Sequence, residues 1–379
     1  MTSASSILLT GFPSSFLARR LLAKMLVKLP EAHLMCLVSD NFMKQAQDLR
    51  RVLPKAERRR VELVPGDVSA MDFGMTGKEF LQLAGKTDAI HHCPTATRPG
   101  VERQVAERVN IGGAGEILEL AEASDTIQRV VHWSSASVSG KRQGHVLESE
   151  LAKPPAFRSV VEETLFRAER VMREAMDHLP ITVLRPSIIV GDSRTGEIDR
   201  LEGPYLLILL MLSAPVDLRV PLPGRGDTGL NLVPIDFVVD AGLTLALDPR
   251  SVGRTFHLVD DQPPTARRVF ELIAEEAGRP GPVGSLPTQI ATALLRTPGL
   301  ERFSHIPRTF LEQLSTDVVY DDRNTQELLA GTGIVCPPAA SYLKVMVDHV
   351  RREQRARAEA RKQPEPIERP SEEADDPLA

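Results

Sequence analysis

The first part of the chain holds a strand-turn-helix pattern whose turn is suited to binding an anion. The apolar run Ser6 to Leu9 passes through Thr10 and Gly11 into a helical pattern that extends from about Ser15 to Leu29. A second apolar run, His33 to Val38, follows. The N-terminus of such a helix presents free N–H groups and positive dipole charge at the ends of parallel strands, where a pyrophosphate binds. The pattern predicts the crossover of a dinucleotide-binding fold.

Asp40 follows the second predicted strand, at the place from which a carboxylate reaches a ribose. A carboxylate there accepts hydrogen bonds from ribose hydroxyls and repels a 2′-phosphate, which favours NAD over NADP. Asp40 also fits a second interpretation, as the cap of a helix that begins near Asn41. The sequence leaves both interpretations open.

The histidines and cysteines do not have the spacing of a metal site. His91 and His92 are adjacent in a predicted strand, so their side chains point to opposite faces and do not share one ion. Cys36, Cys93 and Cys336 are far apart and odd in number, which argues against a zinc site or a disulfide framework. We expect no metal, and we expect a reducing, cytoplasmic location.

The composition describes an ordinary globular protein. The chain has 379 residues, 42% hydrophobic residues, a net charge of -5 and a pI near 6.0. That balance gives no general attraction to nucleic acid or to an anionic membrane, and 4% aromatic residues leave little for base stacking. No cationic and apolar leader opens the chain, and the longest lipid-like run, Tyr205 to Ala214, is about half of a membrane span. We therefore expect no nucleic-acid partner and no membrane span.

Short apolar runs alternate with helical patterns along most of the chain, which predicts a doubly wound, mostly parallel α/β sheet of the Rossmann type. The predicted strands are Ile7 to Thr10, His33 to Val38, Val61 to Val64, Ala89 to His92, Arg129 to Ser134, Ile181 to Arg185 and Thr255 to Leu258. The predicted helices after the first are Asn41 to Val52, Lys78 to Ala84, Val101 to Ala123, Phe157 to His178, Phe237 to Leu247 and Thr265 to Ala277.

Breaks in this alternation predict the domain organisation. We expect a dinucleotide-binding domain over residues 1–260, with a lobe insertion at about 192–233, a small C-terminal substrate lobe over 261–350, and a disordered polar tail over 351–379. The apolar run Tyr205 to Leu212 is either the wall of an acyl tunnel or a buried helix, and the buried helix is favoured.

Several strings together resemble the extended short-chain dehydrogenase/reductases, in the branch that reduces fatty acyl and carrier-protein thioesters. The most specific is Leu184-Arg185-Pro186-Ser187-Ile188-Ile189-Val190-Gly191-Asp192-Ser193-Arg194-Thr195-Gly196-Glu197. The supporting matches are Pro65 to Val68, His92, Asn110, Ser134 to Gly140, Leu232 to Asp236 and Thr255 to Leu258. The resemblance, from about Ile7 to Val350, implies a nicotinamide cofactor and an acyl-type substrate.

The resemblance also implies which residues lie at the cofactor, and several depart from the family pattern. Thr10 and Gly11 match its first turn, but Ser14 or Ser15 and Ala18 stand where further glycines are usual. Ser39-Asp40 stands where the branch has an arginine for the 2′-phosphate, and Pro94-Thr95 replaces paired alanines. The other implied cofactor residues are Asp67 and Val68, which would hold the adenine, and His92, Asn110 and Pro186.

The family's chemistry needs a Ser or Thr to orient the carbonyl, a Tyr to give a proton, and a Lys four residues later that activates the Tyr. Ser135 matches the first role, with Ser134 as a second candidate. Val161 and Leu165 occupy the Tyr and Lys positions, and neither exchanges a proton.

No shift of register restores the pair, because the chain has only Tyr205, Tyr320 and Tyr342, and none has Lys at the fourth position after it. A reductase would need a substitute donor such as Tyr205, Glu163 or water. Our leading hypothesis is therefore a catalytically impaired family member that binds NAD(H), an acyl ligand or a protein partner. That partner would be another protein or a second copy of this chain in a homodimer. The competing hypothesis is an active NAD(P)H-dependent reductase of an acyl thioester or related carbonyl, with Ser135 and an atypical proton donor.

Overall fold

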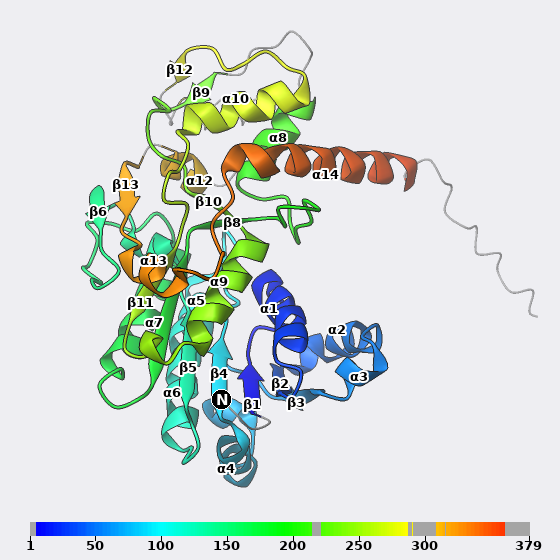
Figure 1. The fold of residues 1–379 in the computed structure, drawn as a ribbon, viewed down its shortest axis with the longest axis vertical. Helices are drawn as coiled ribbons and strands as arrows, with labels where there is room; N and C mark the ends of the chain where they lie inside the picture. The colour runs from blue at the N-terminus through cyan, green and yellow to red at the C-terminus, as the bar shows by residue number, and fades with distance from the viewer. Residues whose placement is uncertain (1–4, 214–220, 287–289, 291–307, 315, 361–379) are drawn as a thin grey trace, which may run out of the picture.

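The centre of the protein is a seven-stranded, wholly parallel sheet in the order β11-β7-β5-β4-β1-β2-β3 (Figure 1). The computed structural model describes residues 5–213, 221–286, 290, 308–314 and 316–360. The sheet's strands are β1 Ser6–Leu9, β2 His33–Val38, β3 Val61–Pro65, β4 Ala89–His92, β5 Arg129–Trp133, β7 Ile181–Pro186 and β11 Thr255–Leu258. All seven predicted strands are in this sheet, so the predicted doubly wound fold is confirmed.

Helices cover both faces of the sheet because successive strand residues point to opposite sides. Ile7 and Leu9 join the core formed with α1 and α9, while Leu8 joins the core formed with α4, α6 and α7. These helices are α1 Phe16–Lys28, α4 Gly77–Lys86, α6 Gly113–Glu122, α7 Val160–Glu174 and α9 Ile235–Leu247. The strands are apolar on both faces since neither face meets water.

The sheet domain also contains further helices and turns. They are α2 Asp40–Arg51, α3 Lys55–Arg58, α5 Arg103–Ala106, the π-helical turn η2 Glu107–Gly112, and the 3₁₀ turns η1 Met71–Gly74, η3 Ala136–Ser139 and η4 Pro249–Ser251. The helical pattern that we predicted over roughly Val101 to Ala123 is confirmed as a continuous helical stretch, Arg103 to Glu122, but a π turn, η2, separates α5 from α6 within it. The apolar periodicity runs through all three and does not register the wider π turn.

A second core gathers at one end of the molecule, at the top of Figure 1. Its helices are α8 Pro204–Ser213, α10 Ala266–Ala277, α12 Arg308–Gln313 and α14 Ala339–Ala360, and α13 Arg323–Leu329 packs beside the sheet domain instead. Three two-stranded parallel ladders also lie outside the main sheet: β8 Ile188–Val190 with β10 Leu232–Pro234, β9 Leu222–Pro223 with β12 Ser285–Leu286, and β6 Gly144–Val146 with β13 Val318–Tyr320. Part of the predicted polar tail, 351–360, belongs to α14, and 361–379 lies outside the described residues.

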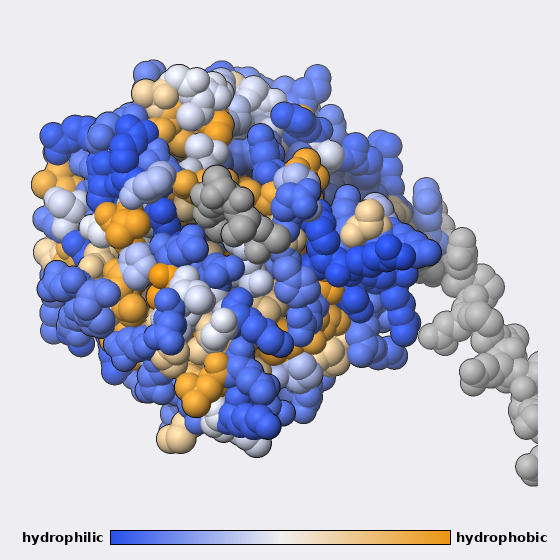
Figure 2. Space-filling model, turned by 60° about the horizontal axis from the view of Figure 1, so that its bottom comes forward, coloured by the Kyte–Doolittle hydropathy of each residue, from blue (hydrophilic) through white to orange (hydrophobic). Residues whose placement is uncertain are grey.

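The surface carries no large apolar face in the view of Figure 2, where hydrophobic residues form small patches among hydrophilic ones. The most exposed large apolar side chains come from separate segments, at Val27, Val52, Met71 and Val335. In the described part of the chain, no helix has the length and apolar character needed to cross a bilayer.

Candidate functional site

The turn between β1 and α1 is built from one glycine and two capping serines. Gly11 has φ +88°, and an added Cβ would lie 2.8 Å from the carbonyl oxygen of Cys93, so only glycine fits there. Ser15 caps α1 by accepting from the amide of Ala18 at 3.3 Å, and the Ser14 hydroxyl donates to the Gly11 carbonyl at 3.2 Å. Ala18 is fully buried against the sheet. The serines thus close the turn locally where the family pattern has glycines.

An outer cavity of about 640 Å³ opens in front of this turn. Ser14, Ser15, Phe16 and Leu17 form one wall of it. The amides of Phe16 and Leu17 belong to the first turn of α1, where helix geometry provides no intrahelical acceptor. The cavity therefore meets the positive end of α1, which is the place for a phosphate predicted from the sequence. The predicted residues Ser135, Val161, Leu165 and Pro186 also line it, as do Pro94 and Thr95.

Thr10 and His92 lie behind the turn rather than in the cavity wall. Thr10 Oγ1 is 2.9 Å from His92 Nδ1 and accepts from the amide of Cys93 at 3.2 Å. His92 is buried and stacks on His132 with ring centroids 5.5 Å apart. Burial, together with the neighbouring His132, lowers the pKa of His92 to about 3, so it is neutral near pH 7. The pair fixes the ends of β1 and β4 against each other, and His91 points to the opposite face, where Trp133 Nε1 donates to its Nδ1.

The residues predicted to meet the ribose and the adenine lie outside the outer cavity. Asp40 is the first residue of α2, whose N-cap is Ser39, so the prediction that Asp40 itself is the cap is wrong. Asp40 lines a separate open depression beside His33 and Glu62. Asp67 accepts from the amide and hydroxyl of Ser69, which closes a local turn. Val68 packs against Gly113, because a Cβ added to Gly113 would lie 3.3 Å from the Val68 side chain.

The two candidate serines at the end of β5 have different partners. The Ser134 hydroxyl donates to Glu169 Oε2 at 2.6 Å, in a fully buried network in which Glu169 pairs with Arg185. Burial opposes the charge of Glu169, but Arg185 and the hydrogen bonds outweigh it and lower its pKa. Ser135 is half-buried, its oxygen accepts from the Ser137 amide at 3.2 Å, and the two hydroxyls are 2.9 Å apart. Both serines line the outer cavity, but the Ser134 hydroxyl is committed to Glu169, so Ser135 has the hydroxyl that is more available to a ligand.

The α7 helix presents an apolar side to this serine. Val161 lines the outer cavity, and Leu165 is buried in a cluster with Val138 and Phe166. Asn110, in the π turn, anchors α7, because its amide donates to the Ala96 carbonyl at 3.1 Å and to Thr164 Oγ1 at 3.0 Å. Asn110 is thus a buried bridge between α7 and the segment after β4.

None of the three tyrosines presents a free phenol to the cavities. The Tyr205 oxygen accepts from the Gly191 amide at 2.8 Å, and Tyr342 donates to the Leu232 carbonyl at 3.1 Å. Tyr320 lines a second cavity, with its oxygen 3.2 Å from Ser139 Oγ. Since the Ser139 hydroxyl donates to the Ala136 carbonyl, Tyr320 is the donor in that contact and its proton is engaged. Glu163, the other proposed substitute, pairs with Arg103 at 3.0 Å and lines neither cavity.

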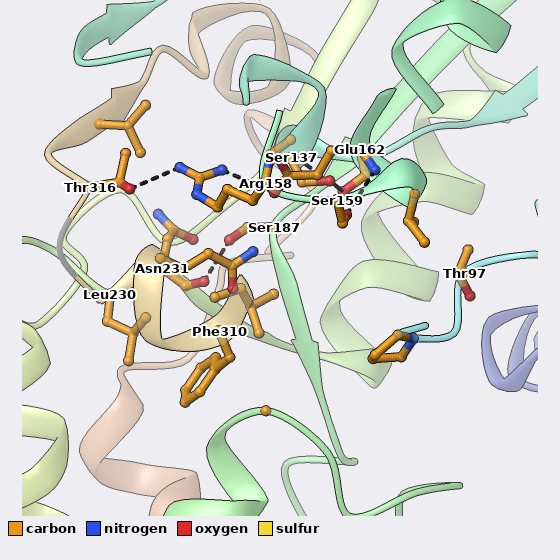
Figure 3. A pocket seen from close by; sticks show the side chains of 18 of the residues that line it. Thr97, Ser137, Arg158, Ser159, Glu162, Ser187, Leu230, Asn231, Phe310 and Thr316 are labelled. Carbon is orange, nitrogen blue, oxygen red and sulfur yellow. Dashed lines mark hydrogen bonds and ion pairs between the residues drawn. The ribbon is translucent and has the colours of Figure 1, made fainter. Parts of the chain in front are cut away.

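The second, inner cavity has a volume of about 340 Å³ and shares Ser135, Ser137 and Val161 with the outer one. Figure 3 shows Arg158 on its wall between Thr316 and Glu162. Arg158 Nη1 pairs with Glu162 Oε1 at 3.0 Å, with both side chains buried, and burial raises the pKa of Glu162. Sequence reasoning missed this pair, although its i, i+4 spacing at the start of α7 is a visible signal.

The loop that follows β8 forms the outer rim. Arg19 Nη2 pairs with Asp199 Oδ1 at 2.7 Å while its Nη1 donates to the Pro13 carbonyl at 2.6 Å. Arg20 pairs with Glu197 at 3.0 Å. We call this rim, residues 192–203, the clasp loop, because these two arginines tie it to α1. At its base, Asp236 accepts from the Ser193 amide and hydroxyl at 2.9 and 2.6 Å, which holds the loop to the first turn of α9.

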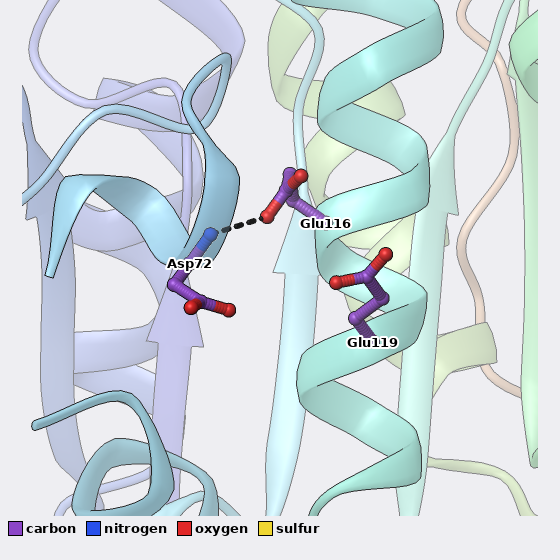
Figure 4. Close-up of side chains that lie close together, drawn as sticks. All are labelled: Asp72, Glu116 and Glu119. Atoms are coloured by element: carbon purple, nitrogen blue, oxygen red, sulfur yellow. Dashed lines mark hydrogen bonds between the residues drawn. The ribbon is translucent and has the colours of Figure 1, made fainter. Parts of the chain in front are cut away.

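Three carboxylates also meet outside the cavities, at Asp72, Glu116 and Glu119 (Figure 4). The Asp72 amide donates to Glu116 Oε2 at 2.8 Å, which gives Glu116 a role in holding the turn η1 against α6. The sequence separation of these residues hid the grouping from sequence reasoning.

A family model described as male sterility protein, of the NAD-binding type, matches residues 9–242. The chain belongs to this family. The predicted resemblance to extended, thioester-reductase-like short-chain dehydrogenase/reductases is confirmed, because the family's reductases and reductase domains are its relatives.

Two curated proteins that are similar to this chain are named as reductases. It is 28% identical over 287 residues to glycine betaine reductase ATRR of Emericella nidulans, which covers 72% of this chain and 22% of the relative. It is 26% identical over 230 residues to fatty acyl-CoA reductase wat of Drosophila melanogaster. That alignment covers 53% of this chain and 43% of the relative. The chain thus spans less than half the length of these curated relatives.

Among solved structures, the terminal R domain from the myxalamid PKS-NRPS biosynthetic pathway is similar over 93% of this chain and 92% of that chain, with a TM-score of 0.75 and 27% identity. A thiolation-reductase di-domain from an archaeal non-ribosomal peptide synthetase, at 17% identity and a TM-score of 0.70, shares the fold.

Proposed function

We propose that this chain binds a nicotinamide dinucleotide and an acyl-type ligand, and that it acts as a binding or regulatory protein whose standard reductase chemistry is impaired. One observation carries the proposal. Val161 and Leu165 occupy the positions of the proton donor and its activator, Tyr205 and Tyr342 line neither cavity, and the phenol of Tyr320, which lines the inner cavity, is hydrogen-bonded to Ser139. A bound nicotinamide would supply a hydride, but the carbonyl oxygen would lack an acid to complete the reduction.

The dinucleotide part rests on the outer cavity and the α1 terminus. Gly11 is retained at the one position where a Cβ would collide with the Cys93 carbonyl, and the first-turn amides of α1 face the cavity. The preference for NAD(H) rests on the sequence, in which Ser39-Asp40 offers no cation to a 2′-phosphate. In the structure Asp40 lies outside the outer cavity. A partner protein or a second copy of the chain would then bind the dinucleotide-bound form selectively.

The alternative is an active NAD(P)H-dependent reductase of a thioester or related carbonyl. Glu162 favours it, because this buried carboxyl lines the same cavity as Ser135 and burial raises its pKa. The ion pair with Arg158 works against it, since the arginine stabilises the deprotonated carboxylate.

A titration with NADH and NADPH by calorimetry, at concentrations that detect millimolar binding, tests the dinucleotide part. We expect NADH to bind more tightly than NADPH. If neither binds, the dinucleotide part of the proposal is contradicted. Steady NADH oxidation after addition of an acyl thioester would replace the binding role with the reductase.

A further inference from the structure

The apolar run that the sequence offered for an acyl chain does not line either cavity. Tyr205, Leu207, Ile208 and Met211 are buried in the second core, where α8 packs against α10 and α14. Only Pro204, at the start of α8, reaches the outer cavity. The buried-helix interpretation of this run is the one that the structure supports, and the described residues of α8 offer no apolar channel for a long alkyl chain.

The inner cavity is instead lined by polar and apolar side chains together: 12 of its 22 lining residues are polar, although most of the surface that they expose to it is apolar. Its Arg158 and Glu162 side chains are only 4% and 3% exposed, and Arg158 Nη2 donates to Thr316 Oγ1 at 2.9 Å. The Thr316 hydroxyl in turn donates to the Glu312 carbonyl at 2.9 Å, which fixes this wall. An alkyl chain that displaced water from such a wall would leave polar groups facing hydrocarbon, at a cost in free energy.

Several hydrogen-bonding groups on the walls remain available to a ligand. Within the described part of the chain, the Gln313 amide and the Thr97 hydroxyl line the cavity without a hydrogen-bond partner. Ser135 and Ser137 share one contact between them, which leaves the pair one hydrogen to donate. These groups suit hydroxyl, carbonyl or amide functions.

The charges of the lining select against an anion. Arg158 is neutralised by Glu162, and among the described residues that line the cavity the one further charged residue, Glu202, is also negative. A second carboxylate or a phosphate would therefore meet a net negative site.

We propose that the inner cavity takes a short acyl group that carries hydroxyl or amide functions and no negative charge. This inference rests on the proposed function, since it names the acyl class that the binding protein accepts. The carbonyl lies at Ser135, which lines both cavities, and the polar part of the acyl group points toward Gln313, which lines the inner cavity alone.

Calorimetry with four N-acetylcysteamine thioesters in the presence of NADH tests the inference. The 3-hydroxybutanoyl thioester is expected to bind roughly 10-fold more tightly than the butanoyl, octanoyl or succinyl thioester, the discrimination that one or two hydrogen bonds supply. Equal or tighter binding of the butanoyl, octanoyl or succinyl thioester would overturn the inference, and so would binding of none of the four. NADH oxidation is followed in the same samples. Turnover of the bound hydroxyacyl thioester would remove the binding role but leave the ligand class standing.

A matched pair of variants locates the preference. Gln313→Leu is expected to reduce the preference for the 3-hydroxybutanoyl thioester several-fold and to leave NADH affinity unchanged. Gln326→Leu, an exposed position on α13 outside both cavities, is the control and should change neither. Thermal melting establishes that both variants are folded. A folded Gln313→Leu protein that keeps the full preference would contradict the placement of the ligand.

Discussion

Ser134 donates its hydroxyl hydrogen to Glu169 Oε2 at 2.6 Å, and both residues are buried. Ser134→Ala would remove one hydrogen bond from a carboxylate that is sealed from water, so we expect the free energy of unfolding to fall by about 1.5–3 kcal/mol. Ser135→Ala removes a local contact at a half-buried position and should cost less than about 1 kcal/mol. Urea denaturation of both variants measures the difference, and equal losses would show that Ser134 is not held as described.

The pH dependence of stability should carry the signature of buried neutral histidines. Burial lowers the pKa of four histidines to about 3 or about 4: His91, His92, His132 and His257. The unfolded chain therefore binds more protons than the folded one below about pH 6.5, and stability falls as the pH drops from there toward 4. Each histidine would cost roughly 2 kcal/mol by pH 5. Burial raises the pKa of Glu148 to about 7, and this carboxyl offsets part of the loss in the same range.

One substitution isolates this effect. Neither ring nitrogen of His132 has a hydrogen-bond partner among the described residues, so His132→Phe should keep the stability measured at pH 7. The slope of the unfolding free energy with pH gives the number of protons taken up on unfolding. Between pH 6 and 5, that number should be about one lower in the variant than in the original protein. His145→Phe, at an exposed position, is the control and should leave the slope unchanged. An unchanged slope in His132→Phe would mean that the imidazole is hydrated in solution.

The clasp loop should govern how fast a dinucleotide leaves. Arg19→Ala removes both the pair with Asp199 and the bond to the Pro13 carbonyl, so the dissociation rate of NADH should rise several-fold. The pair is partly exposed, so the change in stability should stay below about 1 kcal/mol. Arg51→Ala, which removes an exposed pair on α2, is the control. Stopped-flow fluorescence measures both rates, and identical rates would show that the clasp loop does not retain the cofactor.

Restoring the missing groups tests why the chemistry stops. Val161→Tyr with Leu165→Lys would place a phenol and an ammonium on the side of α7 that lines the outer cavity. We expect NADH oxidation with the 3-hydroxybutanoyl thioester in the double variant and none in Val161→Tyr alone. Leu165→Lys costs stability because Leu165 is buried, so melting of the double variant must be measured alongside. A folded double variant that binds NADH and stays inactive would place the defect elsewhere.

The sheet could be predicted from the sequence because its signals are local. Each strand is a short apolar run between helical patterns, and all seven runs became neighbours in one parallel sheet. The Ser14-Ser15 turn was predicted for the same reason, since strand, turn and helix are contiguous. The division of the predicted helix over Val101 to Ala123 was missed because a π turn changes the backbone without changing which residues are apolar.

The candidate site was harder to predict because it forms across long sequence separations. The inner cavity joins Thr97, Arg158 and Tyr320, which share no local pattern. Asp40 follows β2 as predicted, but as the first residue of α2 it lines a different depression. The sequence did not distinguish the roles of Ser134 and Ser135, because the two serines are adjacent and identical in type. They differ in their partners: Ser134 meets the buried Glu169, and Ser135 meets the neighbouring Ser137.

The central claim is that the protein binds its ligands without reducing them, and one measurement tests it most directly. NADH and the 3-hydroxybutanoyl thioester are added at concentrations that saturate both sites by calorimetry, and NADH absorbance is followed over hours. The account predicts a ternary complex with no loss of absorbance above the protein-free control. Steady oxidation of NADH in proportion to protein concentration would contradict it.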